Sequence, residues 1–306
     1  MSPCRSDSLA YAVELALLVL LAALWGASYT LIKIGVESIP PVTLIAGRTA
    51  LAASALIAVA RARGLEMPID AATWRRFLVQ AGLNSVIPFT LIAWAEQSVD
   101  AGLATILNSS APIFVFILTS LTPGRQAATR RQLFGVIAGM IGVVLIVGTQ
   151  ALSGIGRQLS AQLAIVAATL CYAGAALFGR SFRGLDPMVP AAGSLLCGTL
   201  MLVPLSLAVD HPWTLAPSAR SILALVGLAV FSTALAFTLY FRLLRTLGSA
   251  GATAQAYLRV PIGVAISLAV LGEALEPSAL IGLACVIAGV AAMTLPHERR
   301  APTLRR

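Results

Sequence analysis

Arg259 is the residue of this sequence whose type and position point most clearly to chemistry. It lies well inside an apolar run that extends from residue 250 to residue 271. A guanidinium at the centre of a bilayer costs several kcal/mol, so Arg259 is expected to face protein or a water-filled cavity. Its forked donors suit a substrate carboxylate. The alternative is a structural role, in an ion pair or in hydrogen bonds to helix carbonyls.

Other polar and aromatic residues also interrupt apolar runs. Buried polar groups need partners or water, and aromatic rings give a small ligand both an apolar contact and a polar edge. Hydrogen bonds between helices and an aromatic belt at the lipid interface are the structural alternatives. With Arg259, the candidate substrate-binding residues are Trp25, Tyr29, Asn84, Trp94, Asn108, Ser109, Tyr172 and Tyr257.

Two further charged residues are interpreted as mainly structural. Arg48 is expected to reach outward toward the interface or to pair with Glu96 or Glu37. Glu273 is expected to cap the following helix or to bond to nearby backbone. Glu14 is the single candidate for a carboxylate that couples transport to protons.

The sequence shows no catalytic constellation. His211 and His297 fall in a predicted loop and in the tail, and the four cysteines form no CxxC pair. Paired carboxylates and a phosphate-binding loop are also missing. We therefore expect no enzyme activity, no metal and no cofactor. A membrane-embedded enzyme and an open channel are the less favoured alternatives to a carrier.

Composition places these residues in a membrane protein. The 306-residue chain is 58% hydrophobic and 11% charged, whereas soluble domains carry roughly 25% charged residues. A spanning helix needs about 20 apolar residues. The fold class predicted is an all-α membrane protein with ten transmembrane helices, at 12–34, 42–61, 76–96, 101–121, 132–150, 159–180, 187–208, 219–243, 250–271 and 278–295.

The distribution of basic residues predicts the orientation. With a cytoplasmic amino terminus, most of the 21 Lys and Arg residues fall in inside segments, while Lys33, Arg157 and Arg220 fall outside. Both termini are then cytoplasmic. Because the arginines lie in short loops and form no basic face, the expected partners are a small molecule and membrane lipid rather than nucleic acid. The oligomeric state stays open.

The two halves of the chain resemble each other. Residues 101–105 read AGLAT and residues 250–254 read AGATA, and Pro112 matches Pro261 at the same offset. An odd number of spans in each half predicts inverted repeats, at 1–152 and 153–306. Chance similarity between apolar segments is the alternative. Pro112 and Pro261 each remove a helical hydrogen bond and are candidate hinges.

These motifs resemble the drug/metabolite transporter superfamily, specifically its EamA-type permeases. The resemblance rests on Leu24-Trp25-Gly26, on Tyr240-Phe241-Arg242, on the segment 248–252 with Pro261, and on Leu271-Gly272-Glu273. It implies export of small metabolites, most readily amino acids, by alternating access through a midplane cavity in a bacterial-type inner membrane. Exchange of sugar phosphates or nucleotide-sugars is the alternative. The sequence departs from the family pattern at Thr122-Pro123-Gly124, where a Gly-Glu pair is usual, and at Arg259.

Overall fold

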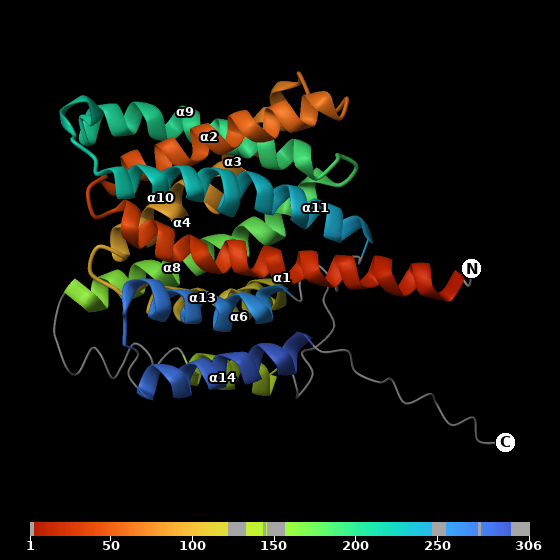
Figure 1. Cartoon of the computed structure of the whole chain (residues 1–306), viewed down its shortest axis with the longest axis vertical. Coiled ribbons are helices and arrows are strands. Elements are labelled where there is room, and N and C mark those ends of the chain that lie inside the picture. Colours follow the sequence, from red (N-terminus) through yellow and green to blue (C-terminus); the bar gives the residue numbers. More distant parts are fainter. Residues whose placement is uncertain are drawn as a thin grey trace.

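The computed structural model describes residues 3–121, 133–142, 145, 157–246, 255–274 and 277–294, and every regular element in these ranges is a helix. Lipid cannot satisfy exposed backbone groups, so a chain of this composition is expected to pair its N–H and C=O groups within helices. The all-α class is therefore confirmed for the described part of the chain. Figure 1 shows the helices lying side by side as a layered bundle.

The helices of the first half follow the predicted spans closely. The third predicted span consists of three consecutive segments, and the fourth consists of two, with a break at Ser109-Ser110, two residues before Pro112. The elements are α1 (Pro3–Gly35), α2 (Pro41–Ala62), α3 (Ala71–Ala81), η1 (Gly82–Val86), α4 (Ile87–Ala95), α5 (Ala101–Asn108) and α6 (Ala111–Ser120).

The second half follows the same order of elements. Its eighth predicted span is again composed of three segments, and Pro261 lies inside a continuous helix. The elements are α8 (Arg157–Phe178), η2 (Gly179–Phe182), α9 (Met188–Val209), η3 (Pro212–Thr214), α10 (Ala219–Ala229), η4 (Val230–Leu235), α11 (Ala236–Thr246), α13 (Gln255–Leu271) and α14 (Pro277–Thr294).

Seven helical stretches in the described part of the chain, some of them made of consecutive elements, are long and apolar enough to cross a membrane. Three shorter apolar helical stretches, Leu133–Gly142, Leu258–Leu271 and Pro277–Gly289, fall where the fifth, ninth and tenth spans were predicted. The chain is thus a multi-pass helical protein, and the count of ten spans stays a prediction.

Two π-helical segments interrupt the third and eighth predicted spans. They are η1 and η4, and their separation is close to that between the AGLAT and AGATA segments. A π-helical turn adds a residue to the backbone and redirects the side chains around it, and such turns occur frequently at functional sites. Here η1 carries Asn84 and η4 carries Ser232 and Thr233.

The two ends of the bundle differ in charge. The α2–α3 connection, the segment from η2 to α9 and the beginning of α1 lie together at one end, called the basic end here (Figure 1). Arg61, Arg63, Arg75, Arg76, Arg180, Arg183 and Arg242 lie in or near its connections. At this end Asp70 caps α3: the Thr73 N–H donates to its carboxylate over 2.8 Å, which lowers the pKa of Asp70 below its ordinary value.

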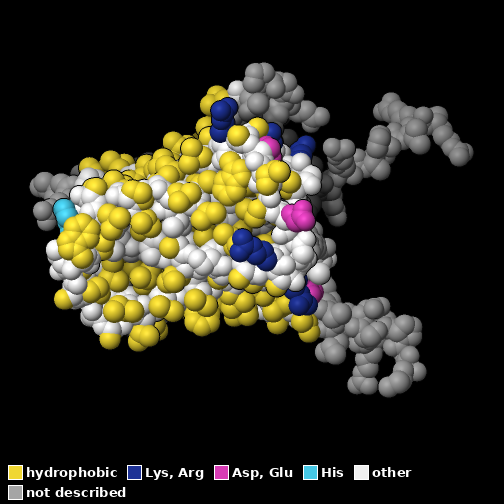
Figure 2. All heavy atoms as spheres, turned by 90° about the horizontal axis from the view of Figure 1, so that it is seen from above, with side chains coloured by type: hydrophobic (Ala, Val, Ile, Leu, Met, Phe, Trp, Pro, Cys, Tyr) yellow, Lys and Arg dark blue, Asp and Glu magenta, His cyan; other side chains and the backbone are white. Residues whose placement is uncertain are grey.

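The outer surface of the bundle is largely apolar. Figure 2 shows a face dominated by hydrophobic side chains, with the charged residues gathered toward one end. Exposed large apolar residues occur on most helices, among them Leu51, Leu163, Leu200 and Leu223. An apolar surface of this extent suits contact with lipid chains.

Helices α1 and α13 cross at backbone contact. An added Cβ on Gly26 would lie 2.9 Å from the Gly263 nitrogen and 3.0 Å from the Arg259 carbonyl oxygen. Any larger residue at either glycine would force the two helices apart. The glycines therefore fix the position of Arg259 relative to α1.

Polar contacts tie the helices together at the opposite end. Lys33 Nζ donates to the backbone oxygens of Glu96 and Val99 over 2.6 and 2.8 Å. The Glu273 carboxylate accepts the N–H groups of Ala101 and Gly102 over 2.8 and 2.9 Å. Glu273 thus bonds to backbone as expected, and the backbone groups it binds are those at the start of α5.

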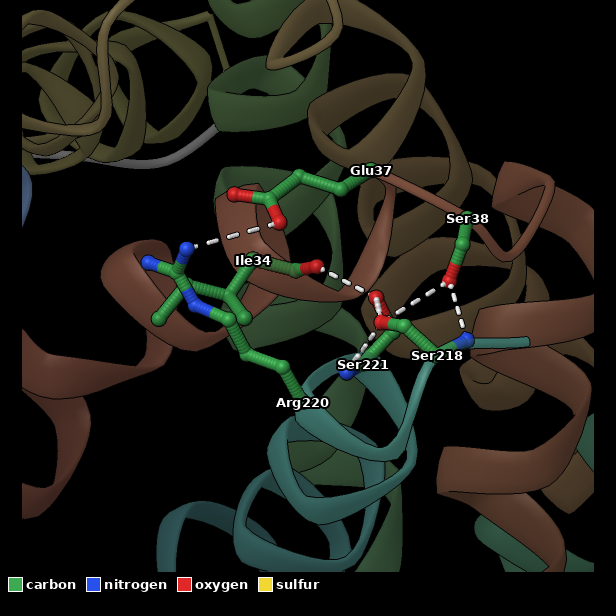
Figure 3. Close-up of polar contacts among 6 residues, drawn as sticks. All are labelled: Ile34, Glu37, Ser38, Ser218, Arg220 and Ser221. Carbon is green, nitrogen blue, oxygen red and sulfur yellow. Dashed lines mark hydrogen bonds and ion pairs between the residues drawn. The ribbon is translucent and has the colours of Figure 1, made fainter.

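A further set of contacts joins the end of α1 to the start of α10 (Figure 3). The Ser221 hydroxyl donates to the Ile34 carbonyl over 2.8 Å, and the Ser218 N–H donates to Ser38 Oγ over 3.0 Å. The Arg220–Glu37 ion pair beside them, at 3.8 Å, is exposed. These contacts and those of Lys33 and Glu273 are called the closing contacts below.

Replacing Gly26 by alanine is expected to destabilise the protein, because the new Cβ meets backbone atoms that cannot move independently. We expect a loss of ~1–3 kcal/mol, the usual cost of overpacking, seen as a lower melting temperature in detergent. Gly174→Ala is the control, since its Cβ would meet only the Leu83 side chain at ordinary distances of 3.7 and 3.8 Å. Equal stability of both variants would contradict the close crossing.

Replacing Glu273 by alanine is expected to release the first turn of α5. Two charge-assisted hydrogen bonds are lost, at a cost of ~1–3 kcal/mol. The Ala101 and Gly102 amides should then exchange with deuterium faster, as measured by mass spectrometry. Glu37→Gln is the control, because its exposed ion pair contributes ~0–1 kcal/mol. Unchanged exchange in the Glu273 variant would contradict the capping role.

Candidate functional site

One cavity of about 620 Å³ lies inside the bundle. Residues of both halves line it, from α1, α2, α3, η1, α4, α5, α6, α8, η2, α9, η4, α11 and α13. Its lining reaches the basic end through Gly179, Arg183 and Pro187, but includes none of the residues in the closing contacts. Among the described residues, the lining therefore extends from the interior toward the basic end and does not include the closing contacts of the opposite end.

Arg48 is held in this cavity by contacts on two sides. It is 5% exposed, its Nε donates to Thr233 Oγ1 over 3.0 Å, and its guanidinium lies 3.8 Å from the centre of the Phe89 ring. Thr233 is placed by η4, where its hydroxyl donates in turn to the Leu228 carbonyl five residues earlier. These contacts fix the guanidinium while leaving it part of the cavity wall.

The expected structural role of Arg48 is only partly right. Among the described residues Arg48 forms no ion pair with Glu96 or Glu37: Glu37 pairs with Arg220, and neither Glu96 carboxylate oxygen has a hydrogen-bond partner. Nor does Arg48 reach the surface. The expectation assumed that a cation in a span needs a carboxylate or water, whereas here a hydroxyl and an aromatic face serve instead.

Arg259 lines the cavity from α13. Its Nε is buried and has no hydrogen-bond partner among the described residues, and the same holds for Gln80 Oε1, Asn108 Oδ1 and Ser232 Oγ, which belong to other lining residues. Buried polar atoms in proteins are normally hydrogen-bonded. Four unpartnered atoms around one cavity indicate a site that receives polar groups from a ligand or from solvent.

Aromatic side chains form two parts of the cavity wall. Trp25 lies against Phe237 and Tyr240, with ring centres 6.0 and 5.5 Å apart. On the other part, the Phe89 ring lies 6.3 Å from that of Tyr172 and also stacks on Arg48. Such rings give a small ligand apolar contact and polar edges.

The structure places six of the nine candidate residues around the cavity. Asn108 Nδ2 donates to the Tyr29 hydroxyl, which joins two of them. The lining candidates are Trp25, Tyr29, Asn84, Asn108, Tyr172 and Arg259. That these six residues line the cavity shows only where they lie, and their roles in binding stay predictions.

The other three candidates are placed differently. Trp94 is 45% exposed and is not among the lining residues, a position that suits contact with lipid. Ser109 donates its hydroxyl to the Ile106 carbonyl at the break between α5 and α6. The side chain of Tyr257 and that of the candidate hinge Pro112 lie outside the described part of the structure.

Several lining residues escaped the sequence analysis. Phe89, Ser194, Ser232, Phe237 and Tyr240 were not among its candidates, although all line the cavity. Their apolar or weakly polar types give no signal in an apolar run. The π-helical segments that turn Asn84 and Ser232 inward also have no sequence signature.

The described lining carries positive charge only. Its charged residues are Arg48, Arg183 and Arg259, and none of its described members is Asp or Glu. Buried guanidinium groups in a medium of low dielectric constant attract anions strongly. No group of His, Cys, Asp and Glu suited to a metal occurs among the described residues. The arrangement is suited to holding a small anionic or carboxylate-bearing molecule.

Comparison with known proteins shows which proteins this chain is similar to. The EamA-like transporter family matches the chain twice, over residues 13–148 and 159–295. The chain is similar to the uncharacterized inner membrane transporter YedA of Escherichia coli K12, at 26% identity over 89% of this chain and 87% of that protein. It is also similar to a probable terminal-alkyne amino-acid exporter of Streptantibioticus cattleyicolor, at 28% identity over 94% of this chain and 96% of that protein.

A solved crystal structure shares the fold. It has a TM-score of 0.63, 19% sequence identity, and covers 92% of this chain and 97% of its own. The two matches of the family model together cover most of the sequence, and the relatives named above are transporters. The chain therefore belongs to the EamA-like transporter family and is a multi-pass membrane transporter.

Proposed function

We propose that the chain exports small carboxylate-bearing metabolites, amino acids foremost, by alternating access through the cavity. The observation that carries this proposal is one buried cavity lined by Arg48 and Arg259 and reaching only one end of the bundle. Arg259 is the proposed clamp for the substrate carboxylate, since its Nε has no partner among the described residues. Arg48 supplies a second positive charge. The name of the relative from Streptantibioticus cattleyicolor supports amino acids as the substrate class.

The remaining candidates complete the proposed binding site. Asn84, Asn108 and Tyr29 are proposed to bond polar groups of the substrate, while Trp25 and Tyr172 contact its side chain. Ser109, Tyr257 and Trp94 stay as less central candidates. Pro112, the second residue of α6 after the break at Ser109-Ser110, and Pro261, inside α13, are the proposed hinges.

The proposed architecture has ten spans in two inverted repeats, 1–152 and 153–306, in a bacterial-type inner membrane. The matching π-helical segments and the double match of the family model support the repeats. The basic end is proposed to be cytoplasmic, because basic residues are enriched in cytoplasmic loops. The cavity then faces the cytoplasm, and the closing contacts seal the outer side.

A second candidate substrate class is favoured by the charge of the cavity. Two guanidinium groups, with no acidic residue in the described lining, attract a net anion more strongly than a zwitterion. Sugar phosphates and nucleotide-sugars meet this condition. An amino acid must place its ammonium group on aromatic faces or amide oxygens instead, such as those of Trp25 and Asn108.

Counterflow in proteoliposomes separates these candidates. Vesicles loaded with unlabelled compound are expected to accumulate labelled amino acids of the same kind, and sugar phosphates more weakly. Stronger accumulation of the phosphates would select the second class. Absence of accumulation with every carboxylate and phosphate tested would contradict the proposed function.

Arg259→Ala is expected to reduce transport efficiency by ~10- to 100-fold, the range for one lost charge-assisted hydrogen bond. Arg48→Ala should have a similar effect. Arg75→Ala is the control, since Arg75 is an exposed arginine of the basic end that belongs neither to the lining of the cavity nor to the closing contacts. The initial rate is measured against substrate concentration at matched amounts of folded protein. Wild-type rates in the Arg259 variant would remove its proposed role.

Fusion of a reporter to each terminus tests the proposed orientation. A fluorescent protein that matures only in the cytoplasm should be bright at both ends, and alkaline phosphatase should be inactive at both. An even number of spans requires this agreement. Termini on opposite sides of the membrane would contradict the ten-span arrangement and with it the inverted repeats.

A further inference from the structure

Glu96 is a buried carboxyl group that the transport site does not use. It follows the last residue of α4 and is 0% exposed, and neither of its carboxylate oxygens has a hydrogen-bond partner among the described residues. Apolar residues of the core surround this position, including Ile92, Ala95 and Val99. Leaving an ionised carboxylate in such a place costs several kcal/mol. The neutral, protonated form is therefore the one that fits the structure.

The charged groups near Glu96 are all engaged with other partners. Lys33 of α1 donates to the backbone oxygens of Glu96 and Val99, not to the carboxylate. Arg48 of α2 bonds to Thr233, and Glu273, beyond α13, accepts two N–H groups of α5. Glu273 has the same sign as an ionised Glu96 and opposes its ionisation. The ionisable groups that act on Glu96 are Lys33, Arg48, Glu273 and Tyr29.

Glu96 lies beyond the closed end of the cavity, among the closing contacts. Ile92, one helical turn before it, lines the cavity, whereas Glu96 does not. The backbone oxygen of Glu96 is itself bonded by Lys33. If this end opens, α1 must separate from α4 and α5, and the carboxyl group comes into contact with solvent on that side.

We propose that Glu96 is a proton-binding residue whose protonation permits the outer end of the transporter to close. This inference rests on the alternating access of the proposed function and adds a ligand, the proton, to it. In the open state solvent stabilises the ionised carboxylate. On closing, Glu96 takes one proton from the outer solvent onto a carboxylate oxygen. On reopening it returns that proton to the same side.

The direction of the pH effect follows from these two states. The closed state binds one proton more than the open state, so acid on the outer side favours closure and alkali favours opening. For one proton, the ratio of closed to open molecules changes by about tenfold per pH unit above the pKa of the open state. Because the proton enters and leaves on one side, it sets the conformational equilibrium without being carried across.

The test measures the opening directly, without substrate. Spin labels are attached to cysteines at Gln97, after α4, and at Val209, at the end of α9, in full-length protein without its other cysteines. Both positions are exposed, and α9 is joined to α2 by the bond between Asp210 and Thr43. Double electron–electron resonance in lipid nanodiscs then gives the distance distribution between the two labels. The measurement covers the range from about pH 5 to about pH 9, in which buried carboxyl groups titrate.

The wild-type protein is expected to lose its short-distance population as the pH rises. Glu96→Gln, which is neutral at every pH and close in shape, should keep the short distance throughout. Glu66→Gln, at an exposed carboxyl group of the basic end, is the matched control and should behave as the wild type. A wild-type distribution independent of pH, or a Glu96→Gln variant that still responds to pH, would overturn the proposal.

Counterflow measurements separate this proposal from the proposed function. Wild-type counterflow of amino acids should depend on the pH of the outer solution, and Glu96→Gln should remove that dependence. Failure of every substrate would reject the substrate class but leave the distance measurement valid. A pH-independent distance with active counterflow would reject the proton site and leave the transport function standing.

Discussion

The energetic cost of a charged side chain inside a lipid-embedded bundle governs the arrangement of this protein. Arg48 is buried yet has no carboxylate partner among the described residues. A hydroxyl from η4, the face of Phe89 and the polar cavity must together offset the loss of hydration. To place these groups around one guanidinium, α2, α4 and η4 must converge. The cavity is thus the place where the bundle can hold charge.

The same constraint explains why the two ends are built differently. At the basic end, exposed arginines and connections surround the opening of the cavity, and water can hydrate them. At the opposite end, helix termini leave backbone N–H and C=O groups without helical partners. Lys33 and Glu273 satisfy several of these groups across helices. These two charged side chains therefore bind the backbone of neighbouring helices rather than solvent, which makes the contact between the helices specific.

Much of the fold could be predicted from the sequence, because apolar runs of sufficient length have few alternatives to helices in lipid. The sequence also indicated that Arg259 and Asn108 line a cavity, because polar residues stand out in apolar runs. The rotation of each helix could not be predicted: these helices are apolar on most sides, so periodicity does not tell which side faces the cavity. Phe89 and Tyr240 therefore gave no signal. Glu96 lies at the end of a predicted span, where a carboxylate is ordinarily expected to reach water.

The contact of Gly26 with Gly263 has a mechanical consequence. With no side chains between the two backbones, α1 and α13 can change their crossing angle, but they cannot approach further and have little to interdigitate. When one helix rotates about such a contact, its residues are displaced more the farther they lie from the contact. Since the Arg259 carbonyl lies at this contact, a change in the crossing angle would displace the ends of α1 and α13 far more than the backbone of Arg259.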